Sequence, residues 1–585
     1  MITAVKSLGE MAIKSQNKKL IDVLIEDPNS NGVYNNIITV NFILEDDNVQ
    51  YEGIKLEEYD SSKLNKYLYT SAGGNGPGYT PVAKITEPEK TFNIKIKNWF
   101  KVLNKKNIKL DDKNKAILEK IKNLLDENSD EIINQIQSIR KDIPKKEGLL
   151  LTLKFNINGE YKYIGDIDAF SDLLLQLDSE KYMKLYAENK VCSICGRKKD
   201  IVFGKIDTYA FYTIDKRGYI VGGFDEKDSW RNYPVCPECR LALEEGKKYI
   251  ESQLTFGFYG LKYQLIPNFI IGEEFVKREI LDIFEDTNKL ISLKKNIKKR
   301  FIADQDDILD YLKDADDSMT LNFLFLQKSN SAERILLLIE DVFPSHLKEI
   351  FAAKEEIDRI FNDSFTFRNI RNFLSRSDIN KRDSDLDGYF LDLTDRIFRG
   401  RPVDLNFLLK FIMKRIRDEF VNDRFYKNSI KDGLMAVAFL EKLKLIKMEV
   451  IKMEERRLDS FFEKYGPNFD VPLKRGLVLL GSLTEFLLRK QYSEREAKPF
   501  MKNLKGLKMT ERDIKGLLPK VQNKLEEYDS FDKGKRILAK ETSNYLLTAG
   551  DDWHMSIDEI NFYFACGINL ADEIANIIYK KEEEK

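Results

Sequence analysis

The amino-acid sequence predicts an α+β fold: a mixed N-terminal region with an inserted four-cysteine, zinc-ribbon-like module, then a mainly α C-terminal helical bundle. Three observations predict it. Short apolar runs that end at Gly or Asn-Gly lie within the first 270 residues, as expected for strands and hairpins. Two C-x-x-C pairs interrupt that region. From about residue 275 onward, apolar residues recur at helical spacing between Lys- and Glu-rich faces.

The length of 585 residues leaves room for about four domains. Changes in sequence character along the chain divide it into four regions. They are an N-terminal α+β region with a Gly-rich loop (1–185), the four-cysteine module (186–250), a mainly helical middle region (251–445) and the C-terminal helical bundle (446–585).

Two segments of the first region predict strands. "IITVNFILEDDNVQYEGIKLE" (37–57) and "GLLLTLKFNINGEYKYIGDID" (148–168) hold short alternating or continuous apolar runs. The Asn-Gly step in the second segment is a strong hairpin signal. We therefore expect strands joined by tight turns at both places.

A glycine-rich segment, "YTSAGGNGPGYTPVAKIT" (69–86), lies between them. It is neither a Walker loop nor a dinucleotide fingerprint, because no Gly-Lys-Ser/Thr follows and the last fingerprint position is Tyr79. A plain surface loop is one interpretation. The functional one is that backbone amides and the Asn75 side chain approach a phosphate or a base edge.

The cysteines follow the pattern C-x2-C-x40-C-x2-C, in "VCSICGRKKD" and "YPVCPECRLALEEG". Two such pairs supply the four tetrahedral thiolates that structural zinc prefers, and they leave no open coordination position. The predicted ligands are Cys192, Cys195, Cys236 and Cys239. Four ordinary thiols, or a redox pair, are the alternative. The linker "TYAFYTIDKRGYIVGGF" is rich in aromatic and β-branched residues, which favours a hairpin beside the metal.

The later half predicts helices in "SAERILLLIEDVFPSHLKEIFAAKEEIDRIF" and "DLNFLLKFIMKRIRDEFVNDRF". Between Val471 and Glu541 the chain has 17 Lys/Arg against 10 Asp/Glu. In "KPFMKNLKGL" the lysines face one side of a predicted helix and the apolar residues the other. Thr510 and Asp513 predict a capping box at the next helix. This excess of positive charge marks a polyanion surface or, alternatively, a solvated lysine face.

Other features exclude several classes of protein. The net charge of -1 argues against a uniformly basic nucleic-acid coat. The N-terminus lacks a secretory signal and no apolar run is long enough to span a membrane, so a cytoplasmic protein is expected. "DSDLDGYFLDLT" has Thr394 where a calcium loop needs Glu. The acidic run "ADQDDILDYLKDADD" favours a solvated helix face over a nuclease site. The two histidines, His346 and His554, form no hydrolase motif.

Taken in order, "SAGGNGPGYTPVAKIT", the "CSIC" and "CPEC" pairs, "KYQLIPNFI" and "LNFLFLQKSNSAERILLLIEDVFPS" resemble the large subunit of type I-B CRISPR effector complexes, the Cascade family. The resemblance runs through most of the chain. It implies a non-catalytic subunit of an antiviral RNA-guided complex that recognises the protospacer-adjacent motif in duplex DNA, helps unwinding and R-loop formation, and recruits a separate helicase-nuclease. In this family the C-terminal helical portion resembles the small subunit.

The resemblance implies guide RNA, target DNA, the backbone subunits of the complex and a small subunit as partners, and no membrane. It gives candidate roles to individual residues. Candidates for the motif reader are Gly73, Gly74, Asn75, Gly76, Tyr79 and Lys84. Candidates for a path along the displaced strand are Lys474, Arg475, Lys498, Lys502, Lys505 and Arg512. Candidates for an internal start that produces the small subunit from the same gene are Met448 and Met453.

Two other classes stay open from the sequence. One is a metal-dependent nuclease that uses the carboxylates Asp306, Asp307 and Asp310. The other is a zinc-stabilised scaffold that binds only protein. Divalent-dependent cleavage by the isolated chain would favour the first, and absence of salt-dependent DNA binding would favour the second.

Overall fold

The computed structural model describes residues 1–579 except 16–18, 46–47, 72–75, 106–107, 145, 213, 215–217, 219, 222, 224, 271–276, 279–280, 282–318, 330–331, 375, 377–380, 382–384, 423 and 448–457. Within it the chain forms two compact units, 1–252 with 328–334, and 253–327 with 335–585. The division after Ser252 lies beside the expected boundary at 250. The boundaries expected at 185 and 445 lie inside units.

The first unit contains a five-stranded sheet in the order β2-β1-β4-β3, with β5 pairing with β4. β1 pairs in parallel with β4, and all other pairs are antiparallel. The strands are β1 Asn36–Glu45, β2 Asn48–Glu58, β3 Ala83–Lys84, β4 Leu149–Ile157 and β5 Glu160–Tyr163. Both predicted strand segments are confirmed. The predicted Asn-Gly turn is formed by Asn158 and Gly159, both with positive φ, as a two-residue hairpin turn of this type requires.

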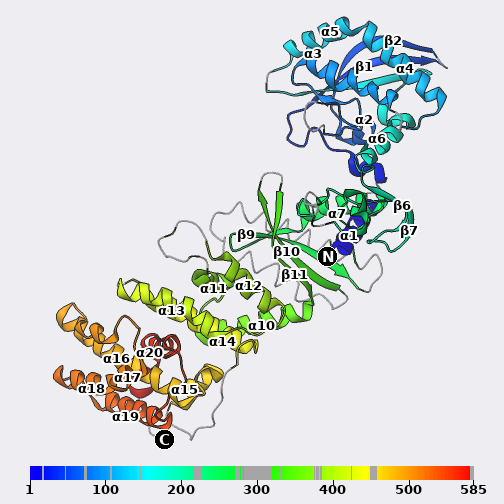
Figure 1. Ribbon diagram of the computed structural model, residues 1–585. Coiled ribbons are helices and arrows are strands. Elements are labelled where there is room, and N and C mark those ends of the chain that lie inside the picture. Colours follow the sequence, from blue (N-terminus) through cyan, green and yellow to red (C-terminus); the bar gives the residue numbers. More distant parts are fainter. Residues whose placement is uncertain are drawn as a thin grey trace. The chain divides into compact units, whose positions relative to one another are not determined.

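Helices cover this sheet, with α4 and α5 on one face (Figure 1). The helices of the unit are α1 Ile2–Ser15, α2 Leu64–Tyr67, α3 Pro88–Thr91, α4 Asp112–Glu127, α5 Ser129–Asp142, α6 Asp168–Glu180 and α7 Pro237–Gln253. Short 3-10 or π helices are η1 Leu20–Leu24, η2 Ser61–Lys63, η3 Phe92–Ile96, η4 Lys97–Asn104, η5 Ile164–Asp166 and η7 Glu226–Arg231.

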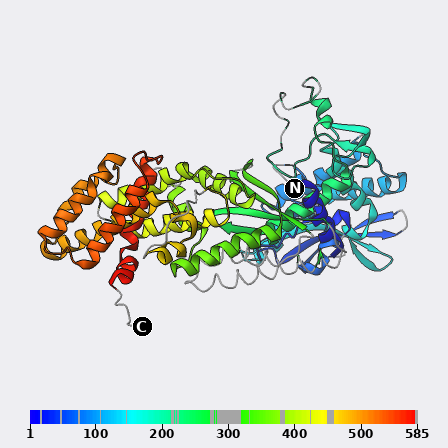
Figure 2. The same ribbon diagram turned by 90° about the horizontal axis from the view of Figure 1, so that it is seen from below.

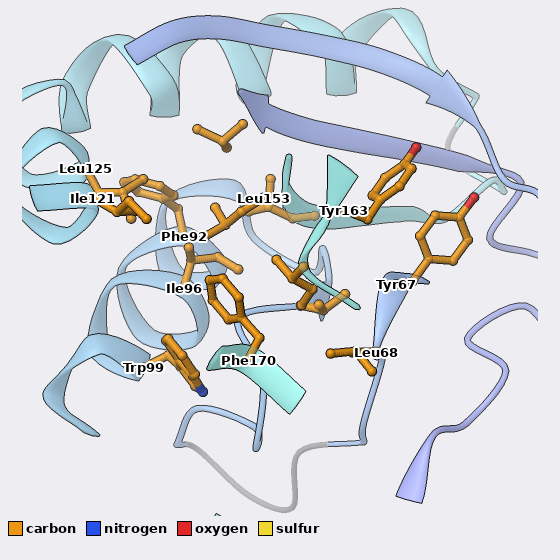
Figure 3. Close-up of a cluster of buried hydrophobic side chains, with 14 of the residues drawn as sticks. Tyr67, Leu68, Phe92, Ile96, Trp99, Ile121, Leu125, Leu153, Tyr163 and Phe170 are labelled. Carbon is orange, nitrogen blue, oxygen red and sulfur yellow. The ribbon is translucent and has the colours of Figure 1, made fainter. Parts of the chain in front are cut away.

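The core of this region lies between the sheet and the helices (Figure 3). Trp99 stacks on Phe170 with ring centroids 5.5 Å apart, and Phe155 of β4 lies 5.8 Å from Phe170. Burying side chains of this size is worth about 1.5 to 3 kcal/mol each. The fold of the N-terminal region therefore does not depend on the cysteine module for its apolar core.

A separate two-stranded sheet, β6 Tyr186–Val191 with β7 Lys198–Phe203, carries the first cysteine pair in its turn. In the linker 208–224 the described residues contain no strand, and the residues next to Gly218, where the hairpin is expected, lie outside the described residues. A hairpin does form around the first cysteine pair, because the turn that brings Cys192 and Cys195 together also joins two strands.

The second unit begins with a four-stranded sheet in the order β11-β10-β9-β8. Its strands are β8 Thr255–Phe258, β9 Leu261–Phe269, β10 Met319–Ser329 and β11 Ala332–Val342, except that 328–334 are grouped with the first unit. The helix predicted from Ser331 is therefore wrong over its first part. The run of apolar residues from Ile335 to Ile339 fits a buried strand as well as a helix, and pairing with β10 decides between them.

The rest of the unit is helical, as predicted. Its helices are α10 Pro344–Phe361, α11 Phe367–Leu374, α12 Asp387–Phe398, α13 Leu405–Val421, α14 Tyr426–Lys442, α15 Asp459–Lys464, α16 Pro472–Arg495, α17 Glu511–Lys515, α18 Leu517–Glu527, α19 Lys533–Thr548 and α20 Ile557–Tyr579, with 3-10 turns η8 Gly466–Phe469 and η9 Pro499–Leu504 (Figure 2).

Helices α16 and α20 touch backbone to backbone. A Cβ atom at Gly481 would lie 2.0 Å from the Phe564 carbonyl oxygen, and one at Gly567 would lie 1.9 Å from that of Val478. The Ser482 hydroxyl donates a hydrogen bond of 2.8 Å to the Gly567 carbonyl oxygen. Only glycine permits this approach, so these two residues fix the crossing of the two longest helices.

Helices α13 and α14 pack into the same core, although they precede the expected boundary at 446. A Cβ atom at Gly433 of α14 would lie 2.7 Å from Ile412 of α13 and 3.2 Å from Phe562 of α20. Arg417 of α13 pairs with Asp558 of α20 at 2.7 Å. The C-terminal helices therefore share buried contacts with α13 and α14.

Candidate metal centre and nucleic-acid surfaces

The first cysteine pair lies in the tight turn between β6 and β7. The Cys192 amide donates to the Arg197 carbonyl at 3.0 Å, and the Gly196 amide donates to the Cys192 carbonyl at 2.9 Å. Gly196 has a φ of 66°, a left-handed conformation that glycine adopts without strain. The turn thus presents the Cys192 and Cys195 sulfurs on one side.

The second pair lies at the start of α7. Val235 bridges to Phe203, with amide-to-carbonyl distances of 2.8 and 3.1 Å, so the strand end before Cys236 is fixed to β7. Pro237 opens the helix, where its missing amide costs nothing, and Cys239 follows in the first turn. The segments that carry the two cysteine pairs are joined directly, because the Ser193 amide donates to the Pro234 carbonyl at 2.8 Å.

These contacts bring the four sulfurs of Cys192, Cys195, Cys236 and Cys239 to within 4.8 Å of one another. Thiolates about 2.3 Å from one tetrahedral ion would be about 3.8 Å apart, so small adjustments complete a four-thiolate site. Three of the four cysteines are buried and Cys195 is half-buried. The predicted set of ligands is therefore brought together, and its chemistry fits a structural metal ion.

Backbone amides also prepare the sulfurs to bind a cation. Although burial opposes ionisation most strongly, amides of Cys195, Cys236 and Ile194 directed at the Cys192 sulfur lower the pKa of Cys192 to about 7. The adjacent Cys239 thiol and burial raise the pKa of Cys236. Four clustered thiols therefore cannot all ionise unless a cation balances their charge, and a bound metal ion supplies that charge.

Helix α7 anchors this centre to the rest of the unit. A Cβ atom at Gly9 of α1 would lie 1.8 Å from the Ala242 carbonyl oxygen, and one at Gly246 would lie 2.0 Å from that of Val5. The two helices therefore cross backbone to backbone, and the crossing needs both glycines.

A buried ion pair makes the second attachment of α7. The Arg240 guanidinium is 1% exposed and pairs with Asp178 of α6, and with Glu244 at 2.7 Å. It also lies 4.6 Å from the centroid of the Tyr182 ring. Burial raises the pKa of Asp178 and of Glu244 even with Arg240 beside them. Sequence reasoning missed this triad, because a lone Arg after Cys239 shows no sign of a partner 62 residues earlier.

The Gly-rich loop is described only in part. Gly73, Gly74 and Asn75 lie outside the described residues. The Lys95 ammonium donates a hydrogen bond to the Gly76 carbonyl oxygen and so fixes the backbone at Gly76. The Tyr79 carbonyl accepts a hydrogen bond of 3.0 Å from the Trp99 indole, and its ring packs against the core. The far end of the loop is thus fixed to the core of the first unit.

Lys84 lies on β3 beyond this anchor. Its ammonium group is 4.4 Å from the centroid of the Tyr34 ring and 5.5 Å from that of Tyr69. Such contacts with aromatic faces hold a lysine without neutralising it. Tyr79 and Lys84 therefore both lie on the C-terminal side of the loop, where Tyr79 packs into the core and the Lys84 ammonium lies against two aromatic rings.

Two of the six residues proposed for a strand path are buried. Arg475 pairs with Asp459 at 2.6 Å and donates to the Phe469 carbonyl at 2.7 Å. Lys474 lies 4.8 Å from the centroid of the Tyr563 ring and 4.0 Å from Glu559. Both side chains are part of the helical core, because α16 is surrounded by other helices at its start. They therefore cannot line a surface.

The other four lie around η9 and α17. Lys502, Lys505 and Arg512 are exposed and Lys498 is half-buried, while Phe500, Leu504 and Leu507 are buried. The predicted separation of charged and apolar sides is confirmed. The helix is a short 3-10 helix, however, because Lys505 and Gly506 take positive φ and end it. The predicted capping box of Thr510 and Asp513 is present. Sequence reasoning did not select the exposed Lys508, although it belongs to the same lysine-rich segment.

The remaining candidates are less informative. Asp306, Asp307 and Asp310, and both Met448 and Met453, lie outside the described residues. In place of a calcium loop, Asp387 begins α12 and pairs with Arg371 at 3.0 Å.

Among the described residues, the four cysteines are the single group of three or more Cys, His, Asp or Glu placed to hold a metal ion. None of the described helices is long and apolar enough to cross a membrane.

Three family models match successive parts of the chain. They are the N-terminal, central and C-terminal domains of the CRISPR-associated protein TM1802 family, at residues 1–176, 189–342 and 365–582. The central match contains all four cysteines, and the C-terminal match begins before α11 and ends after Tyr579. No curated protein matches the chain.

Proposed function

The chain belongs to the CRISPR-associated TM1802 family, and we propose that it is the large, non-catalytic subunit of a type I-B Cascade complex. The observation that carries the proposal is that all three domains of the family match in order along almost the whole chain. In this role the chain binds within an assembly of guide RNA, backbone subunits and target DNA. It works in the cytoplasm, where thiols stay reduced and bind metal.

The assembly reads target sequence by base pairing, so this subunit needs only a short-motif reader and a basic path for the displaced strand. We assign the reader to the loop from Gly73 to Tyr79, with Lys84 beside it. The contacts of Gly76 and Tyr79 support this assignment, because they attach one end of the loop to the core of the first unit, and binding sites are most precise on rigid elements.

The loop assignment has its own test. Gly74→Val, or Asn75→Ala to remove the side-chain amide, should weaken binding of motif-bearing duplex by the assembled complex, since each good base contact is worth about 1 to 3 kcal/mol. Gly257→Val serves as a control in β8 of the second unit, where a Cβ atom would meet nothing within 4 Å. If both loop variants distinguish correct from mutated motifs as the parent does, the loop has only a structural role.

We propose zinc as the metal and structure as its role. The four thiols suit Zn²⁺, and a four-thiolate site leaves no position for a substrate. In a bound complex Cys192, Cys195, Cys236 and Cys239 would hold the ion, and the ion would join the β6–β7 turn to the start of α7. Elemental analysis of protein purified under reducing conditions should find one zinc per chain. Absence of zinc would contradict the assignment.

We also propose that the C-terminal region is made separately, from a start at Met448 or Met453. A product from Met453 would have 133 residues. It would lack α13 and α14, and so it would expose Phe562. Asp558 would lose its partner Arg417, and Glu485 would lose its partner Lys427. The separate product therefore needs another protein surface to cover that face. Intact mass of native complexes tests this proposal, because the species must vanish when both codons become leucine codons.

Co-purification tests the main proposal. The chain expressed with its genomic neighbours should purify in a complex that contains small RNA, and sequencing should show guide sequences. The purified chain alone should neither hydrolyse ATP nor cut DNA. Divalent-dependent cleavage that is lost with Asp306→Asn, Asp307→Asn or Asp310→Asn would favour the nuclease alternative. A complex without RNA or salt-dependent DNA binding would favour the protein-only scaffold.

A further inference from the structure

Three large apolar side chains are exposed near one end of the helical bundle. Phe425, in the turn between α13 and α14, is 87% exposed, Val421 at the end of α13 is 68% exposed, and Tyr492 near the end of α16 is 57% exposed. A single exposed apolar residue is ordinary in a folded protein. A group of them beside a concentration of unpaired positive charge requires an explanation.

Contacts place Val421 and Tyr492 beside the lysine-rich segment, and Phe425 follows Val421 by four residues. A Cβ atom at Gly506 would lie 3.2 Å from a methyl group of Val421, and Arg417 of α13 donates to the Leu507 carbonyl at 2.7 Å. On the other side, the Lys498 ammonium lies 5.4 Å from the centroid of the Tyr492 ring. The end of α13, the end of α16 and the segment 498–508 therefore form one continuous surface.

The cations on this surface differ from most others in the bundle. Lys498, Lys502, Lys508 and Arg512 form no ion pair with another described residue, whereas Lys505 pairs with Asp513 at 2.6 Å and Arg489 pairs with Glu485 at 2.9 Å. A cation without an internal partner is available to a phosphate group. Aromatic faces between such cations are the combination with which proteins bind single-stranded nucleic acid.

We propose that Phe425 and Tyr492 are stacking platforms for the bases of a single strand, and that Lys498, Lys502 and Lys508 contact its phosphates. We call these five residues the stacking patch. This proposal rests on the proposed function and extends it, because the path along the displaced strand was assigned from lysines and arginines alone. A duplex does not fit the patch, since the faces of its bases are already stacked on the neighbouring base pairs.

The first test measures binding of the full chain to a fluorescent oligonucleotide by anisotropy, with DNA and RNA of one sequence as single strands and as duplexes. Phe425→Ala and Tyr492→Ala should each weaken single-strand binding by about fivefold to a hundredfold, the loss expected for one stacked base. Phe425→Trp should bind the single strand as the parent does, because tryptophan keeps an aromatic face at this position. Leu547→Ala, which removes another exposed apolar side chain at 77% exposure, should change nothing. Comparison of the DNA and RNA strands identifies the natural source of the strand.

The second test separates stacking from charge. Each phosphate contact that is lost lowers the slope of log affinity against log salt by about 0.7 for a single strand. Lys502→Ala with Lys508→Ala should lower the slope by about 1.4, whereas Phe425→Ala should lower affinity at every salt concentration and leave the slope unchanged. Lys348→Ala, an exposed lysine of α10, is the control.

The outcomes distinguish this proposal from the function on which it rests. If Phe425→Ala and Tyr492→Ala bind single strands as the parent does, the stacking patch is wrong, even where RNA-containing complexes still assemble. If those variants instead lose a protein from the purified complex and keep strand binding, the patch is a protein interface. If no RNA-containing complex forms with the parent chain, the proposed function itself fails.

Discussion

In the segment from β6 to α7 the strands are six residues long, whereas in the bundle α16 and α20 run for 24 and 23 residues. Short strands bury little apolar area, so the first segment needs cross-links: four sulfurs within 4.8 Å and the buried Arg240 triad. The long helices bury continuous apolar faces and are positioned by glycines in backbone contact. Metal removal and core mutation should therefore act on different parts of this chain.

The largest expected effect comes from breaking the metal centre. Cys236→Ser, or a strong chelator, should destabilise residues 186–252 locally by on the order of 10 kcal/mol, because a structural zinc supplies folding free energy of that size. Limited proteolysis should then cut this segment while 472–579 stays protected. Cys566→Ala is the matched control, since Cys566 is buried in α20 of the second unit and is not among the four predicted ligands. Equal protease resistance of the Cys236→Ser variant and the parent would contradict this prediction.

The next effect is expected from the buried ion pair. Arg240→Ala leaves Asp178 and Glu244 without their partner, and removal of one member of a buried pair costs about 3 to 5 kcal/mol. Urea unfolding monitored by a probe in the first unit should show this loss. Arg231→Ala, which removes an exposed pair with Asp228 at 3.2 Å, should cost no more than about 1 kcal/mol. Similar losses in the two variants would show that the triad contributes little.

The corresponding change in the bundle is Gly567→Val. The added side chain would meet the Val478 carbonyl oxygen, so α16 and α20 must separate, and we expect a loss of about 3 kcal/mol. A chelator should not change the stability of α16 and α20 in this variant, in contrast to its effect on the region of the metal centre. Gly516→Ala is the control, because its nearest contact would be an ordinary 3.7 Å. A neutral Gly567→Val would refute the backbone contact.

The smallest effect concerns pH. The Lys505 ammonium, together with the amide and hydroxyl of Thr510, lowers the pKa of Asp513 to about 2. A carboxyl with a lowered folded-state pKa stabilises the fold above its unfolded-state value, near pH 4, and loses that contribution as pH falls toward 2. Because Asp513 is close to solvent, the contribution is below about 1 kcal/mol. The difference in urea midpoint between the parent and Asp513→Asn should be present at pH 7 and shrink below pH 4; a constant difference would contradict it.

Local signals made several features predictable. The Asn158-Gly159 turn, the Thr510–Asp513 capping box and the cysteine ligand set each depend on residues close in sequence or on a spacing typical of one chemistry. The strand from Ala332 to Val342 was not predictable, because only its pairing partner excludes a helix.

Long-range contacts explain the remaining differences. Lys474 and Arg475 looked like surface cations, and nothing near them in the sequence shows that Glu559 and Asp459 approach them in the fold. The same holds for Asp178 and Arg240, which lie on different helices. Charge excess in a segment therefore indicates a basic surface, and only the packing of helices decides which of its cations reach that surface.

Hydrogen exchange of the full chain, with and without a zinc chelator, tests the comparison most directly. We predict that chelation removes the protection of amides in β6, β7 and the first turns of α7, and leaves the protection of α16 and α20 unchanged, because a structural metal contributes to the folding of its own region. Protection that is unchanged in both regions, or lost equally in both, would contradict the conclusion that a metal centre holds one region and helix packing the other.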